Sequence, residues 1–295
     1  RAVGGFGSSM FSVAAGSILL RAVNDTNRAR AQSLYNGSFL VGMMAGPVVG
    51  GALSGFSLRA PLIIYGFLLI AASASGAVLL RNSVLAAKPT ASQERETITI
   101  KSALALSPYR SALIISFITS WVLFGMSRSI LPLFMVEEIK VSPSYMGLGF
   151  TITTIINGTL LLRAGKLSDL NGRRYAAVIG TSCVTLFILA IAFTTKPWEF
   201  LAASVIVGIG GAFLSTTPSA IVGDVLQGKG GQVIGLFQMS GDAGAMVAPI
   251  ILGFIADHYG FRPAFLASAA LMSAAVLVAI KLPETRASHL GQSSK

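Results

Sequence analysis

Nine apolar runs fill most of the chain, and short polar stretches separate them. Most runs are about 20 residues long, the length that a helix needs to cross the hydrocarbon core of a bilayer. None alternates polar and apolar residues as a membrane barrel strand does, so helices are the remaining way to satisfy the backbone in lipid. The pattern predicts an all-α integral membrane protein with these nine transmembrane helices: roughly 2–20, 34–55, 60–80, 111–134, 144–163, 176–194, 199–222, 232–254 and 263–281.

The connections between the runs are alternately rich and poor in lysine and arginine. One set of connections, which includes the carboxyl-terminal end, holds sixteen of them; the opposite set holds only Arg59, Lys140, Lys196 and Arg262. Because basic loops stay on the cytoplasmic side, the chain is predicted to enter from outside and to end in the cytoplasm. An odd number of spans with an external start leads us to expect further helices upstream of Arg1.

The composition limits the other classes of function. The chain is 53% hydrophobic and only 11% charged, whereas soluble domains carry about a quarter charged residues. The net charge is +11, but the basic residues lie between the apolar runs and form no basic patch, so we expect no nucleic-acid partner. Cys183 is the single cysteine, and Gly228-Lys229-Gly230-Gly231 lacks the spacing of a phosphate-binding loop. We expect no enzyme activity, no cofactor and no metal site.

A polar stretch divides the spans into three and six. Residues 82–109 form its core, and within them residues 94–106 suit either a short amphipathic surface helix or a flexible linker. The predicted organisation has four parts: the last three helices of an amino-terminal half (1–81), a cytoplasmic linker (82–110), a six-helix carboxy-terminal half (111–282) and a cytoplasmic tail (283–295).

An internal repeat supports two related halves. With a shift of 202 residues, Gly42, Gly46, Pro47 and Gly51 align with Gly244, Ala248, Pro249 and Gly253. With a shift of 203, Arg59 aligns with Arg262. The first three spans therefore match the last three.

Residues 42–51 read G-M-M-A-G-P-V-V-G-G and carry the most restrictive motif. Gly42, Gly46 and Gly50 form a bare stripe on a helix, which lets a neighbouring helix approach closely in lipid. Pro47, followed by Gly50 and Gly51, lies inside the same run, and proline removes a backbone donor and bends the helix.

A second motif lies between two later spans and reads G-K-L-S-D-L-N-G-R-R over residues 165–174. Gly165 and Gly172 allow tight turns, Asp169 is suited to the amino terminus of a facing helix, and Arg173 and Arg174 can pair with acids. These features describe a latch between two parts of a bundle; an ordinary basic loop with a turn is the alternative.

The two motifs and the repeat resemble the major facilitator superfamily. Residues 42–51 resemble the fifth-helix motif of its drug:proton antiporters, and residues 165–174 resemble the second copy of its G-x-L-x-D-x-x-G-R-R/K loop. The resemblance implies two halves of six helices, with the fourth to twelfth present here. It also implies that the latch loop faces the helix of residues 42–51, and that Arg1, before Gly5 and Gly7, matches a fourth-helix arginine implicated in proton transfer; a chance arginine at this position is the alternative.

Polar residues within the spans are candidates for the transport site. Asp242 lies near the middle of its span, where a charge is costly unless it faces a cavity or the bundle interior, so it is a protonation or cation site or else a structural acid. Gln238 lies one turn earlier, and Gly241 and Gly244 are expected to leave space beside the acid. Arg128 could pair with Asp242, hold an anionic substrate or reach outward to the headgroups. Two further polar candidates, with interhelical hydrogen bonding as their alternative role, are Asn36 and Asn157.

The sequence thus predicts a secondary transporter that exports small amphipathic compounds or drugs in exchange for protons by alternating access. Uptake or export of a metabolite, such as a sugar or organic acid, on the same fold is the alternative; a non-transport membrane protein is a further one. The expected location is a bacterial cytoplasmic (inner) membrane. The expected partners are a small-molecule substrate, protons and the lipid bilayer, and the protein is expected to be a monomer.

Overall fold

A computed structural model describes residues 59–81, 99–226 and 231–285, together with isolated positions nearer the start, among them Gly42. The chain divides into two compact units, residues 1–94 and 95–295. The described residues contain seven helical segments that are long and apolar enough to cross a membrane. Seven predicted spans are thereby confirmed as helices, while the runs 2–20 and 34–55 lie almost entirely outside the described residues.

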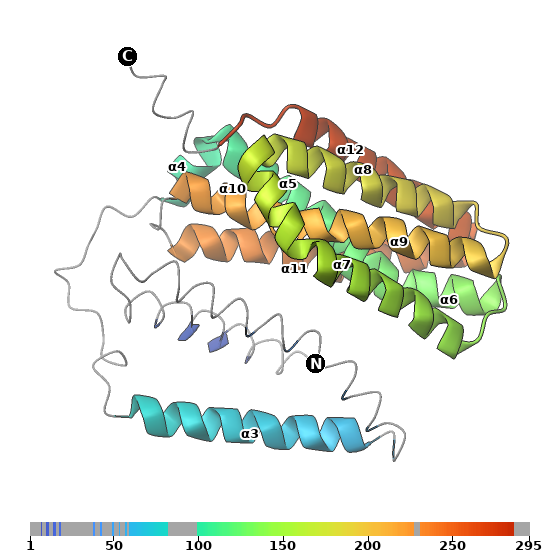
Figure 1. Cartoon of the computed structure of the whole chain (residues 1–295), viewed down its shortest axis with the longest axis horizontal. Helices are drawn as coiled ribbons and strands as arrows, with labels where there is room; N and C mark the ends of the chain where they lie inside the picture. Colours follow the sequence, from blue (N-terminus) through green and yellow to red (C-terminus); the bar gives the residue numbers. More distant parts are fainter. Residues whose placement is uncertain are drawn as a thin grey trace. The chain divides into compact units, whose positions relative to one another are not determined.

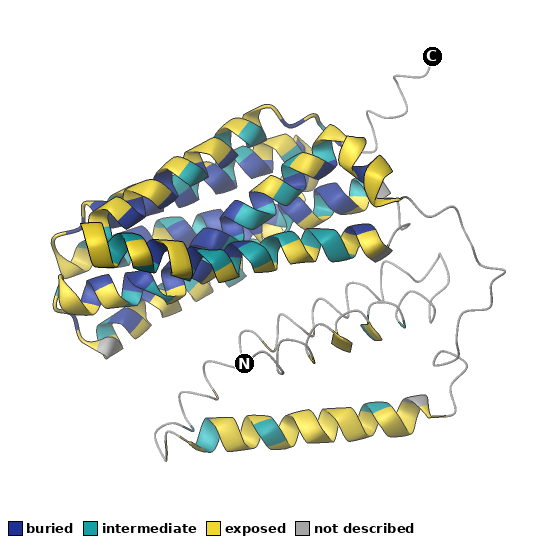
Figure 2. Cartoon of the chain, turned by 180° about the vertical axis from the view of Figure 1, so that it is seen from behind, coloured by how far each residue is buried: buried dark blue, intermediate teal, exposed yellow. Residues whose placement is uncertain are grey.

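The first unit contributes one fully described helix, α3 (Ala60–Leu80). Pro61 lies in its first turn, where a missing N–H costs nothing because that donor has no partner within the helix. Leucine, isoleucine and phenylalanine side chains of α3 are exposed along most of its length, as Figure 2 shows. An apolar surface of this kind suits contact with lipid or with other apolar helices.

The second unit is a bundle of long helices lying side by side (Figure 1). Its helices and their bounds are α4 (Ile100–Ala105), α5 (Ser107–Ser120), α6 (Ile130–Glu137), α7 (Pro143–Asn171), α8 (Arg173–Ala192), α9 (Pro197–Leu214), α10 (Thr217–Leu226), α11 (Gly231–Tyr259) and α12 (Phe261–Ile280). The segments α5 to α6 and α9 to α10 each form one interrupted span, so the bundle has the six predicted spans.

The first span of this unit is interrupted near its middle. A π-helical turn (Trp121–Gly125) and a 3₁₀ turn (Met126–Arg128) separate α5 from α6. The Ser129 hydroxyl donates to the Gly125 carbonyl at 2.7 Å and satisfies one backbone acceptor at this break. Trp121 fixes the turn to α12, because its indole N–H donates to the Ser268 hydroxyl at 3.1 Å inside the core.

Contacts between helices define how the bundle packs. α5 contacts α10, α11 and α12, whereas α9 contacts α7 and α8, and α12 also contacts α8. The fully buried side chains between them are mostly large and apolar, including Phe134, Phe187, Phe200 and Phe265. Figure 2 shows this buried interior and the exposed outer faces of the same helices.

The predicted polar linker is described only at its end. Of the two alternatives for residues 94–106, the described part is helical from Ile100 to Ala105 (α4), and the Thr99 hydroxyl accepts a hydrogen bond from the Ser102 N–H at its start. Pro108 starts α5 directly after it, so the membrane helix begins four residues earlier than the apolar run suggests.

Candidate functional site

The motif of residues 165–174 is mostly helix and not a loop. α7 continues through Gly165 and Asp169 to Asn171, so the turn expected at Gly165 is wrong. The whole change of direction occurs at Gly172, whose φ of 101° lies in the region that favours glycine. A Cβ atom at Gly172 would also overlap the carboxylate of Glu284. The backbone conformation therefore requires glycine at this corner, whereas the Glu284 side chain could turn away from a methyl group.

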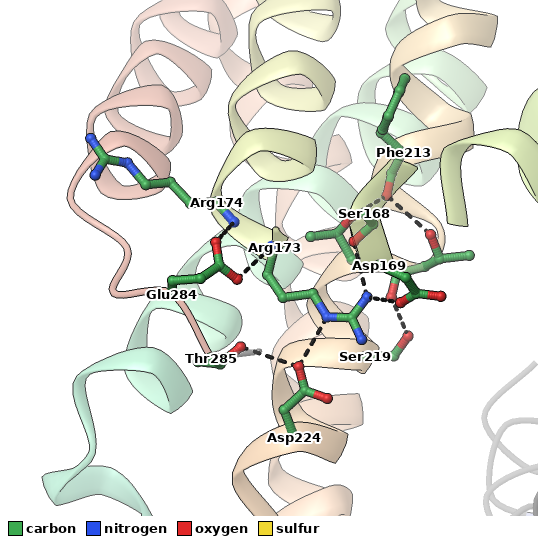
Figure 3. Close-up of polar contacts among 11 residues, drawn as sticks. Ser168, Asp169, Arg173, Arg174, Phe213, Ser219, Asp224, Glu284 and Thr285 are labelled. Carbon is green, nitrogen blue, oxygen red and sulfur yellow. Dashed lines mark hydrogen bonds and ion pairs between the residues drawn. The ribbon is translucent and has the colours of Figure 1, made fainter. Parts of the chain in front are cut away.

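Arg173, the first residue of α8, joins two acids from different helices (Figure 3). Its Nε donates to Asp224 of α10 at 2.9 Å, and its Nη1 donates to Asp169 of α7 at 2.5 Å. The same Nη1 lies 3.1 Å from the Ser168 hydroxyl. The Arg173 side chain is only 15% exposed, whereas those of Asp224 and Asp169 are 24% and 66% exposed. Asp224 is therefore the more buried partner of this arginine.

Glu284, beyond the end of α12, binds the start of α8. Its two carboxylate oxygens accept hydrogen bonds from the backbone N–H groups of Arg173 and Arg174, at 2.7 and 3.3 Å. A carboxylate at this position is favoured by the positive end of the helix dipole. Thr285 completes the contact by donating to Asp224 at 3.2 Å. We call these residues the Arg173 cluster: Ser168, Asp169, Arg173, Asp224, Glu284 and Thr285.

Two charges that match the family pattern, those of Asp169 and Arg174, are left accessible in the described part of the chain. Arg174 is exposed and forms no ion pair with a described residue, although its backbone N–H binds Glu284. In Figure 3 its guanidinium points away from the cluster. Asp169 keeps most of its side chain exposed. The expected contact of this motif with the helix of residues 42–51 stays a prediction.

The second copy of the glycine motif packs one helix of the bundle closely on another. A Cβ atom at Gly244 of α11 would overlap the carbonyl of Phe117 in α5, and one at Gly125 would overlap Ala248. The Ser240 hydroxyl donates to the Leu113 carbonyl at 2.8 Å along the same seam. The space expected beside Asp242 at Gly241 and Gly244 is therefore occupied by α5, and this part of the prediction is wrong.

Asp242 itself lies on the opposite, exposed side of α11, together with Gln238 one turn earlier. Arg128 is also exposed, and its guanidinium stacks 5.1 Å from the centre of the Phe124 ring. Within the described residues Arg128 and Asp242 form no ion pair, so the pairing considered for them is not formed here. Asp242 lies near the middle of its span, whereas Arg128 lies in the last third of the span Ser107–Glu137.

The remaining candidates have differing outcomes. Asn157 is half-buried in α7, and its amide lies against the backbone of α9 at Gly211, which fits an interhelical role. Gly42 is helical and exposed, with open space where a Cβ would lie. The candidates that lie outside the described residues are Arg1, Asn36, Gly46, Pro47, Gly50 and Gly51. Across the described ranges, no three His, Cys, Asp or Glu residues gather as metal ligands.

Comparison with known proteins places these features in context. The profile of the Major Facilitator Superfamily matches residues 1–127 and 113–295. Multidrug resistance protein MdtG of Yersinia enterocolitica is 30% identical over 156 residues, 51% of this chain and 37% of the relative. MdtG of Proteus mirabilis is 28% identical over 162 residues, 53% of this chain and 40% of the relative. The matched segment thus spans well under half of those relatives.

A solved structure agrees on the fold. A bacterial homologue of the iron transporter ferroportin, in its outward-facing state, superposes with a TM-score of 0.61 at 18% identity. The superposition covers 94% of this chain and 69% of that protein. The likeness supports a shared helical architecture and, at this identity, nothing about the substrate.

Proposed function

Because this chain belongs to the major facilitator superfamily, a family of membrane transporters, we propose that it exports small amphipathic compounds in exchange for protons. The two relatives reported above are named multidrug resistance proteins, which supports this branch. Transport would proceed by alternating access, as the two halves rock about a central site.

The observation that carries the proposal is the setting of Asp242. It is an acid twelve residues into the 29-residue α11, it is exposed, and no described residue pairs with it. A structural acid in a membrane helix needs a partner, because an unpaired charge in lipid is costly. An acid that takes up a proton or a cationic substrate instead needs access. We therefore assign Asp242 to proton or cation exchange, with Gln238 on the same face as a hydrogen-bonding neighbour.

Arg128 supports the second candidate, transport of an organic acid. Its guanidinium carries a positive charge in the last third of the first span of the second unit and has no ion pair among the described residues. Its stacking on Phe124 holds the charge at the surface of the helix break, where a carboxylate could reach it.

Proton flux in inverted membrane vesicles tests the proposal. The vesicles carry an acidic interior, and lipophilic cations are added while the pH gradient is followed. We expect wild-type protein to dissipate the gradient on adding a cation and Asp242→Asn not to do so. Asp257→Asn, which alters an exposed acid at the end of the same helix, is the matched control and should behave as wild type.

The alternatives give different results. If Asp242→Asn and wild type respond equally, Asp242 is not the exchange site. If no cation elicits a response but organic acids do, and Arg128→Gln abolishes that response, the protein is an organic-acid transporter.

A further inference from the structure

A narrow apolar groove lies on the second unit between α5, α11 and α12. Its volume is about 320 Å³, and the residues that line it are Leu113, Ile114, Phe117, Ile118, Ser240 and Leu271. Ser240 is the one polar side chain among them, and its hydroxyl already donates to the Leu113 carbonyl at 2.8 Å. The groove therefore presents no unused hydrogen-bonding side chain and suits a hydrocarbon.

The residues that line the groove lie in the same half of their helices. Leu113 and Ile118 follow the start of α5 by six and eleven residues, which places them about 9 and 16 Å along the helix. Ser240 follows the start of α11, and Leu271 precedes the end of α12, each by about 14 Å. The Tyr109 hydroxyl donates to the Val233 carbonyl at 2.7 Å and so joins the starts of α5 and α11 at one end of the bundle. Half of a hydrocarbon core is about 15 Å thick, so an acyl chain that starts at this end of the bundle is long enough to reach the groove.

Two basic residues lie at this end of the helices that line the groove. Arg110 precedes Ile114 by four residues and Phe117 by seven, so it lies on the groove-lining stripe of α5, one turn nearer the helix start. Lys281 directly follows α12, ten residues after Leu271. Both side chains are exposed, and neither forms an ion pair with any residue that the structure describes.

We propose that this groove binds one chain of an anionic phospholipid, with the lipid phosphate held at Arg110 and Lys281. The apolar walls match the hydrocarbon, and the two cations at this end of the lining helices match the charge of the headgroup. Basic pockets between membrane helices on the cytoplasmic side are suited to such headgroups. The proposal does not depend on what the protein transports.

Lipid retention by the purified protein tests this site. The protein is equilibrated in micelles that contain equal phosphatidylglycerol and phosphatidylcholine with identical acyl chains, and the retained lipids are measured by mass spectrometry. We expect wild type to enrich phosphatidylglycerol by about fivefold or more, given the usual attraction of each basic residue for an anionic surface. The double variant Arg110→Gln/Lys281→Gln should lose this enrichment.

Matched variants separate the site from general surface charge and from misfolding. Arg163→Gln/Lys166→Gln removes the same charge from exposed positions of α7 and should retain the enrichment. Ile114→Trp, which fills the groove from a partly exposed position, should reduce retention of both lipids about threefold or more, as expected when a small apolar site is blocked. Leu162→Trp on the exposed face of α7 should leave retention unchanged.

Three results would overturn the proposal. One is equal retention of the two lipids by wild type, and another is an equal loss of enrichment in both double variants. The third is unchanged retention in Ile114→Trp together with displacement of the lipid by soluble glycerol phosphate, which would indicate an anion site without a chain-binding groove. Elution of each variant at the wild-type volume on size exclusion establishes that it is folded.

Discussion

Gly172 and Gly165 belong to one sequence motif but have different roles in the backbone. Gly172 has a φ of 101° beside the Glu284 carboxylate, whereas Gly165 is inside α7 with open space around it. We expect Gly172→Ala to lower the free energy of unfolding by about 1–3 kcal/mol, the usual cost of a strained backbone position. Gly165→Ala should be neutral or should stabilise by up to about 1 kcal/mol.

Thermal unfolding in detergent, followed by circular dichroism, measures this difference. Gly165→Ala is the control, because it adds the same methyl group seven residues away in the same motif. Equal unfolding temperatures for the two variants would mean that the corner at Gly172 tolerates a side chain, contrary to the conformation described.

The Arg173 cluster shows which residue roles can be predicted from the sequence. The motif alone singles out Asp169, Gly172, Arg173 and Arg174, because their spacing is distinctive. Glu284 and Thr285 were missed, since they follow the last span and read as tail. Two signals together could have found Glu284. It is an acid close to the predicted cytoplasmic end of the last helix, and the helix that starts at Arg173, on the same predicted side, has a glycine before it and so lacks a capping side chain of its own.

Helix packing in the second unit depends on Gly244. Its position against the Phe117 carbonyl leaves no room for a side chain, because the close contact there is with backbone and cannot be relieved by a rotamer change. We expect Gly244→Ala to separate α5 from α11 and to lower the free energy of unfolding by about 1–3 kcal/mol, as overpacking in well-packed cores does.

Gly253→Ala is the matched control, since Gly253 belongs to the same repeat on the same helix but has open space where its Cβ would lie. Unfolding of the two variants in mild detergent, monitored by tryptophan fluorescence, compares them directly. If Gly244→Ala had the same unfolding midpoint as Gly253→Ala and the wild type, the glycine stripe of α11 would not be a packing seam.

At the scale of elements, the apolar runs predicted the spans well and their internal breaks poorly. Run length determines whether a segment can cross the membrane, so each described span overlaps a predicted one. The break at Trp121–Arg128 has no proline and lies inside a single predicted span, 111–134. It depends instead on tertiary contacts, including the Trp121 bond to Ser268 and the close approach of Gly125 to Ala248, which no local pattern contains.

For the whole molecule, the open question is how the two halves are held in one state. Arg173 is committed to partners within the second unit, because Asp169, Asp224 and Glu284 all belong to residues 95–295. The ion pair with Asp224 therefore stabilises this half, and the proposed rocking of the halves need not break it. Of the charged residues that match the family pattern, Arg174 and Asp169 keep exposed side chains that could contact the other half.

We accordingly expect Arg174→Gln to reduce transport while changing the free energy of unfolding by less than about 1 kcal/mol, the usual limit for an exposed charge. A latch that contributes about 1.4 kcal/mol to one state shifts the ratio of the two states about tenfold, enough to slow a cycle that must visit both. The measurement pairs initial transport rates in vesicles with thermal unfolding of the same preparations. Lys166→Gln removes an equally exposed charge from the end of α7 and should leave both quantities unchanged. If Arg174→Gln transported at the wild-type rate, this motif would act only within its own half, and the contact between the halves would have to come from other residues.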